Sequence, residues 1–149
     1  MEVFSISPAS TKPLWFIAVI TTLLALVFAI VVYTGYSAQH SRVELRSDRL
    51  TLVGDLWGRT IPLESIDVSQ AMIVNQDQQS EYSLKRRTFG TGLPGYASGW
   101  FRLRNGEKAL VYLTRNTSNV YLPTSLNYIL LLSVEQPERF IETLQRKVN

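Results

Sequence analysis

The segment with the most conspicuous chemistry runs from residue 85 to residue 96 and reads KRRTFGTGLPGY. Three adjacent cations lead into a stretch that contains three glycines and a proline. The candidate binding residues are Lys85, Arg86, Arg87, Phe89, Gly90, Gly92, Leu93, Gly95 and Tyr96. Glycines let backbone N–H groups turn toward an anion, and arginines add charge-assisted hydrogen bonds. The pattern therefore predicts a loop that holds a phosphate or a carboxylate.

A structural interpretation of this segment also stays open. The glycines can serve tight bends in a small barrel, while the cations are solvated or face an anionic bilayer. No Gly-Lys-Ser/Thr follows, which excludes a P-loop. Within the expected loop we predict that Phe89, Leu93 and Tyr96 are exposed, as a tip that binds a peptide or touches a membrane.

Groups suited to catalysis are scarce in the chain. There is no cysteine, which excludes disulfides, thiolate chemistry and cysteine metal sites. His40 is the single histidine and cannot form a metal site or a catalytic triad alone. Glu64 and Asp67 are close in sequence, but nothing indicates the pocket that paired carboxylates need. We therefore expect no enzyme activity, no catalytic residue, no metal and no cofactor.

The charge balance limits the partners. The chain has 15 basic and 12 acidic side chains, a net charge of +3. This excess is mild and lacks the dense basic stripe of a nucleic-acid-binding protein. We expect no nucleic-acid partner.

A long apolar segment near the N-terminus predicts a membrane anchor. Residues 14–33 read LWFIAVITTLLALVFAIVVY. About 20 helical residues at 1.5 Å each span the roughly 30 Å hydrocarbon core, whereas a signal peptide has a shorter apolar region. Aromatic rings at both ends suit the headgroup zone. The expected anchor residues include Leu14, Trp15, Phe16, Leu24, Phe28 and Tyr33.

Charges beside the anchor indicate its orientation. Arg42, Arg46 and Arg49 follow the apolar segment, and only Lys12 precedes it closely. The positive-inside rule then places the C-terminal part in the cytoplasm. The alternative is that these arginines simply belong to the first strands of the domain, since a long domain is translocated largely regardless of flanking charge.

From Arg42 onward the pattern changes to short alternating segments between turn residues, which is typical of antiparallel β-structure. The predicted strands are 42–45, 49–53, 59–63, 67–74, 99–104, 108–114 and 119–123, with 128–132 as an eighth. Polar turns are expected at 75–80 and 116–118. Asn105-Gly106 predicts a two-residue type I′ hairpin with Arg104 opposite Glu107 and Phe101 opposite Leu110.

The C-terminal segment from Gln136 predicts a helix. Pro137 suits a first helical position, early glutamates complement the helix N-terminus, and Arg146 and Lys147 complement its C-terminus. One apolar stripe should pack on the sheet, formed by Phe140, Ile141, Leu144 and Val148.

Several motifs in this order resemble the bacterial pleckstrin-homology-like (bacterial PH) domains. They are Arg87-Thr88-Phe89-Gly90-Thr91-Gly92, Gly95-Tyr96, Gly99-Trp100-Phe101, the strand ALVYL closed by Thr114, and the tail pattern Ser133, Pro137, Phe140-Ile141 and Leu144. The resemblance implies a mainly β (α+β) fold, a bent antiparallel sheet or partly open barrel of about seven strands capped by a C-terminal helix. It also implies no enzymatic activity. Phosphoinositide-binding PH domains carry a long basic loop between their first strands, whereas here that connection is Ser47-Asp48.

These observations predict an N-terminal tail at 1–12, a transmembrane helix at 13–36, a linker at 37–41 and a bacterial PH-like domain at 42–149. We expect a single-pass protein of the bacterial inner membrane. Its domain is expected to bind a protein or peptide partner, or to self-assemble, at the membrane surface. The alternative is binding of anionic lipid headgroups through residues 85–96.

Overall fold

The computed structural model describes residues 4, 10, 12–54, 56–76, 80–114 and 118–148. Most of the expected tail at 1–12, residues 77–79 of the expected turn at 75–80, and residues 116 and 117 of the expected turn at 116–118 lie outside these residues. The chain divides into two units, residues 1–36 and 37–149, and each is described by itself.

The N-terminal unit is built on helix α1, Lys12–His40. The helix continues through residues 37–40, which the sequence suggested as a linker. Within the apolar stretch, the hydroxyl groups of Thr21 and Thr22 donate to the carbonyl oxygens four residues earlier, at 2.9 Å, so they need no other partner. Pro13–Ser37 is the one stretch of the described residues that is long and apolar enough to cross a membrane.

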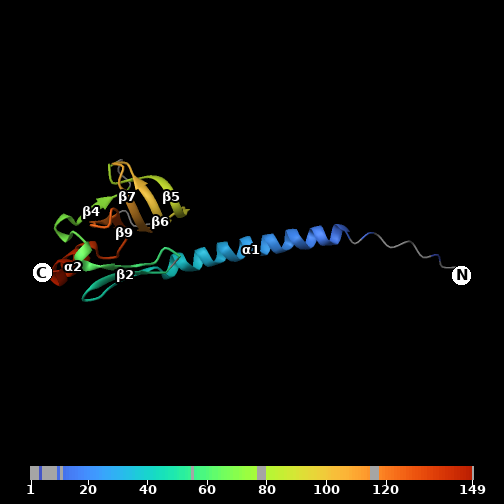
Figure 1. The fold of residues 1–149 in the computed structure, drawn as a ribbon, viewed down its shortest axis with the longest axis horizontal. Helices are drawn as coiled ribbons and strands as arrows, with labels where there is room; N and C mark the ends of the chain where they lie inside the picture. Colours follow the sequence, from blue (N-terminus) through green and yellow to red (C-terminus); the bar gives the residue numbers. More distant parts are fainter. Residues whose placement is uncertain are drawn as a thin grey trace. The chain divides into compact units, whose positions relative to one another are not determined.

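The described residues of the second unit form nine strands and two short 3-10 turns. Figure 1 shows the strands β2, β4, β5, β6, β7 and β9 and the helix α2 of this unit. The strands are β1 (Arg42–Leu45), β2 (Arg49–Val53), β3 (Thr60–Pro62), β4 (Met72–Asn75), β5 (Leu84–Leu93), β6 (Tyr96–Leu103), β7 (Lys108–Leu113), β8 (Ser118–Pro123) and β9 (Ile129–Leu132). The 3-10 turns η1 (Leu63–Ser65) and η2 (Val68–Gln70) connect β3 to β4. The predicted strand 67–74 is therefore wrong in its first half, because Asp67 caps η2 by accepting from the Ser69 amide.

The strands form two sheets. The first has the order β1-β2-β3 and the second the order β4-β8-β9-β7-β6-β5. All pairs are antiparallel except β7 and β9, where Ala109 lies opposite Ile129 in a parallel ladder. The expectation of a purely antiparallel sheet is wrong at this pair. Strand β9 lies between β8 and β7 and is antiparallel to β8. Because β7 and β8 run in opposite directions, β9 runs parallel to β7.

The six-stranded sheet has a hydrophobic core on each face. One core lies between this sheet, the three-stranded sheet and the C-terminal helix, and includes Leu50, Leu110 and Leu130. The other, with Phe101 and Val111, fills the inside of the sheet's own curl. The curl brings the end of β4 to the start of β5, where the Gln76 side chain bonds Tyr82 O and Leu84 N. The fold is mainly β and PH-like, with open sheets in place of a closed barrel.

Helix α2, Pro137–Val148, confirms the predicted C-terminal helix. Leu144 is fully buried, and Phe140 and Ile141 pack against the first core. Val148 is 44% exposed, so its inclusion in the packed stripe is wrong. Phe140 and Ile141 are half-buried.

The predicted hairpin at Asn105-Gly106 exists, but with a different register. Phe101 lies opposite Ala109, and Leu110 lies opposite Trp100. Gly106 alone in this turn has a positive φ, +92°, so the loop has three residues and ends in a glycine bulge. Because a shift of one residue reverses the face, Phe101 and Leu110 belong to different cores.

Candidate functional site

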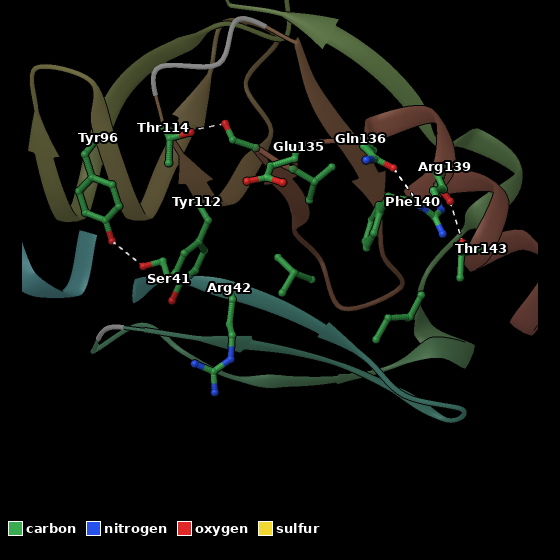
Figure 2. A pocket seen from close by; sticks show the side chains of 14 residues that line it. Ser41, Arg42, Tyr96, Tyr112, Thr114, Glu135, Gln136, Arg139, Phe140 and Thr143 are labelled. Carbon is green, nitrogen blue, oxygen red and sulfur yellow. Dashed lines mark hydrogen bonds between the residues drawn. The ribbon is translucent and has the colours of Figure 1, made fainter. Parts of the chain in front are cut away.

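A groove with a volume of about 570 Å³ lies between strand β1 and helix α2. Its apolar lining comes from segments far apart in the sequence, namely Val43, Leu45, Tyr112, Val134 and Phe140. Tyr96 and Ser41 form one end, with Tyr96 Oη and Ser41 Oγ 3.3 Å apart. Figure 2 shows α2 at the other end, with Tyr112 and Glu135 between. The site is a concave apolar surface with a few polar groups, as ligand-binding sites usually are.

Strand β1 borders this groove with an unused edge. The Arg46 amide donates to Arg49 O in the β1–β2 turn, and hydrogen-bonded pairs alternate along an antiparallel ladder. The amides of Arg42 and Glu44 therefore face β2, while those of Val43 and Leu45 face away from it. Among the described residues β1 has no second neighbour. An extended chain laid beside β1 would find free N–H and C=O groups.

The opposite edge of the same sheet is blocked. The Leu52 amide donates to Arg59 O and the Leu63 amide to Asp48 O, so Ile61 faces β2 and its neighbours face outward. One of those outward positions is Pro62, which has no N–H group. Proline on an edge strand discourages pairing with another chain. The sheet thus closes one edge and leaves the edge beside the groove open.

Charged side chains stand around the groove. Glu135 and Arg139 line it, and Arg139 Nη1 donates to Gln136 Oε1 at 3.2 Å. Arg42 Nε lies 2.9 Å from Glu44 Oε1, an exposed pair that contributes little to stability. Outside the groove, at the β1–β2 turn, the hydrogen bond that Arg49 donates to Asp48 holds the pKa of the Asp48 carboxyl below its ordinary value. The groove lining thus includes one anion, Glu135, and two cations, Arg42 and Arg139.

The predicted binding segment 85–96 is not a loop. Residues 84–93 form β5, an edge strand paired with β6, with bulges between Leu84 and Arg86 and between Arg87 and Phe89. The glycines serve close strand contact: Gly90 lies opposite Gly99, and a Cβ added to Gly99 would lie 2.7 Å from Gly90 Cα. Glycine content suggested a loop, whereas tertiary pairing with β6 makes the segment a strand.

The structure separates the predicted site residues. Lys85, Arg86 and Arg87 are all exposed on β5, and Phe89 and Leu93 are 66% and 50% exposed, as expected. Gly90 and Gly92 lie in the strand, and Gly95, with a φ of +77°, lies in the turn to β6. Tyr96 was expected at an exposed tip, and this is wrong: it is only 8% exposed. Its ring turns inward to the Ser41 end of the groove (Figure 2).

Sequence reasoning did not find the groove. The alternation of Val43 and Leu45 and the helical position of Phe140 were readable signals that these residues face inward. Nothing in the spacing showed that β1 and α2 leave a space between them. The described residues hold no group of three His, Asp or Glu side chains that could bind a metal.

Comparison with known proteins gives one match. A family model described as "Bacterial PH domain" matches residues 42–148. The match begins at the first residue of β1 and ends at the last residue of α2. No curated protein and no solved structure matches the chain. The family resemblance found in the sequence motifs is thereby confirmed.

Proposed function

The chain belongs to the bacterial PH domain family, and from this premise we propose that it is a membrane-anchored adaptor whose groove binds an extended segment of a protein partner. The family supports a non-catalytic interaction domain. The observation that carries the proposal is the open edge of β1 beside the groove. Strand addition at such an edge gives affinity through main-chain hydrogen bonds, and side-chain pockets give specificity.

The groove has the features that this binding mode needs. The outward amides of Val43 and Leu45 supply the ladder, while their side chains, with Tyr112 and Phe140, offer an apolar floor. Glu135 and Arg139 would pair with a basic and an acidic residue of the partner. A second copy of this chain is the alternative source of the added segment.

The anchor and its orientation complete the proposal. Helix α1 would span the bacterial inner membrane as a single pass, on the basis of its length and composition. Arg42 and Arg49 lie in β1 and β2, and Arg46 lies in the turn between them, close after the span. The positive-inside rule then favours a cytoplasmic domain. A reporter that is active only in the cytoplasm, fused after Asn149, tests this orientation.

The groove is tested by removing one outward amide. Peptides are selected from a random display library against the full chain in lipid nanodiscs, and their affinities are measured by fluorescence anisotropy. Val43→Pro deletes an N–H group that faces away from β2, so the β1–β2 ladder keeps its bonds. We expect binding to weaken about three- to tenfold, the equivalent of one backbone hydrogen bond.

Thr60→Pro is the matched control, because Thr60 also faces outward, on the closed edge of the same sheet. It should bind the selected peptides like the wild type. Equal affinity of Val43→Pro and wild type would refute strand addition at β1. If the library yields no peptide and the purified chain dimerises with the Val43 amide protected from hydrogen exchange, the added segment comes from a second copy.

A further inference from the structure

Three apolar side chains stand out from the surface of the C-terminal unit, on two segments that contact each other. Leu56 is 76% exposed, Phe89 66% and Leu93 50%. Leu56 comes from the β2–β3 connection, and the other two from β5. The ring of Trp57 meets the ring of Phe89 edge to face, with 4.8 Å between centroids, which joins the two segments. We call Leu56, Phe89 and Leu93 the apolar tip.

Two contacts hold this region against Ser41. Gly54, two residues before Leu56, has a φ of +140°, and a Cβ there would lie 2.4 Å from Ser41 Cα. Tyr96, three residues after Leu93, places its hydroxyl 3.3 Å from Ser41 Oγ. Both segments that carry the apolar tip therefore pack against Ser41 close to the tip residues.

Ser41 lies close to the bilayer by chain length alone. It follows Ser37, the last residue of the candidate span, by four residues. Four residues reach at most about 14 Å even when fully extended. The headgroup layer is itself several Å thick, since a bilayer of about 30 Å hydrocarbon measures about 40–45 Å in all. Ser41, against which both segments of the apolar tip pack, therefore lies within about 14 Å of the end of the candidate span.

One of the three adjacent cations belongs to this region. The Arg87 side chain runs along β5, so that its Nη1 lies 3.5 Å from where a Cβ of Gly92 would be. This brings the guanidinium level with Gly92, the residue before Leu93, on the opposite face of the strand. Lys85 is eight residues from Leu93 along the strand, roughly 26 Å at 3.3 Å per residue. None of the ion pairs among the described residues involves Arg87.

We propose that the apolar tip lies in the interface of the membrane that α1 spans, with Arg87 against anionic lipid headgroups. Exposed leucine and phenylalanine flanked by a cation are the side chains that bind at the boundary of headgroups and acyl chains. The contact would hold the domain on the bilayer and keep the Ser41 end of the groove at its surface. This inference rests on the anchor in the proposed function and is independent of what binds the groove.

Because the sequence has no cysteine, one introduced cysteine can be labelled with a fluorescent dye at a single chosen position. The full chain carrying Pro94→Cys, in the turn after Leu93, is labelled with the dye NBD and reconstituted in phosphatidylglycerol nanodiscs. We expect blue-shifted emission and quenching by lipids that carry a shallow doxyl group. Ile73→Cys on β4, itself 39% exposed, is the control probe and should report water.

Two sets of variants test the residues named. Phe89→Ser with Leu93→Ser should abolish the shift at position 94, and near-UV circular dichroism verifies that the domain stays folded. Arg87→Gln should lower the ratio of inserted to free tip about fivefold in anionic discs, as expected for one cation near such a surface, and have no effect in phosphatidylcholine discs. Lys85→Gln, farther along the strand, should have little effect in either.

Failure of the anchor and failure of the tip give different results. If the full chain is stripped from vesicles by carbonate, the anchor is refuted and this inference with it. If the chain stays in the vesicles and NBD at positions 94 and 73 has the same emission, only the apolar tip is refuted. A shift that survives the double serine variant would refute the residues named here.

Discussion

The groove beside β1 and the apolar tip are the two surfaces for which we propose partners. The groove is concave and offers unused backbone groups together with a few charges. The tip offers three exposed apolar side chains and one cation. A concave surface with directional hydrogen bonds is suited to selecting one chain, while exposed apolar side chains are suited to a fluid bilayer. The two share only the Ser41 and Tyr96 contact.

The contrast shows that the most exposed apolar residues are not the ones that line the concave surface. The residues that the sequence singled out lie mostly on β5, where they are exposed, whereas the apolar lining of the groove is half-buried or buried. Variants that disturb the groove and leave the apolar tip unchanged, or the reverse, therefore test whether the two surfaces act separately.

The largest effect is expected for Gly99→Val in the β5–β6 hairpin. Gly99 has a φ of +109°, and an added Cβ would lie 2.7 Å from Gly90 Cα. Backbone strain and overpacking together should lower the free energy of unfolding by about 3 to 5 kcal/mol. Thermal unfolding followed by tryptophan fluorescence measures it. Gly92→Ala is the control, because its nearest neighbour is the flexible end of Arg87 at 3.5 Å; a similar loss there would refute the steric argument.

Leu144→Ala tests the groove from the side of α2. Leu144 is fully buried in the first core, so truncation should cost about 2 to 5 kcal/mol. Loosening α2 should also weaken peptide binding, while the NBD signal at position 94 stays unchanged. Glu142→Ala, on the exposed side of the helix, serves as the control. If Leu144→Ala lowered both peptide binding and the NBD signal at position 94, the groove and the apolar tip would not be independent.

Tyr121 belongs neither to the groove nor to the apolar tip, so Tyr121→Phe should leave peptide binding and the NBD signal unchanged. The hydroxyl of Tyr121 donates to Glu107 Oε2 at 2.9 Å, and its loss should cost about 1 kcal/mol at neutral pH. Burial first, and then the neighbouring carboxylate, raise the pKa of Tyr121 above its ordinary value.

The raised pKa gives this variant a pH signature. Above about pH 10 an unfolded tyrosine loses its proton while the folded one keeps it, so the wild type loses stability as the pH rises. The phenylalanine variant lacks this loss. The stability difference between the two proteins should therefore narrow from pH 9 to pH 11 in urea titrations, and a constant difference would contradict the shift.

The smallest effect is expected for Ser98→Ala on β6. The Ser98 hydroxyl is fully buried and has no hydrogen-bond partner among the described residues. Removing an unsatisfied polar group should leave stability unchanged or raise it by up to about 1 kcal/mol. Thermal unfolding is again the measurement. A clear loss would mean that the hydroxyl has a partner, such as a buried water.

The sequence by itself determined the elements whose signals are local. The long apolar helix, strands β1 and β2, and helix α2 follow from hydrophobic length, alternation and capping, which act between neighbours in the chain. The order of the motifs also sufficed to recognise the family.

Only the tertiary structure decided the rest. The segment of β5 is a strand, despite its glycines, because β6 pairs with it. A shift of one residue in the register of β6 and β7 places Phe101 and Leu110 in different cores. The inward turn of Tyr96 and the space between β1 and α2 depend on contacts between segments up to about a hundred residues apart. Such contacts leave no periodic trace in the chain, because each partner alone has the ordinary pattern of its own strand or helix.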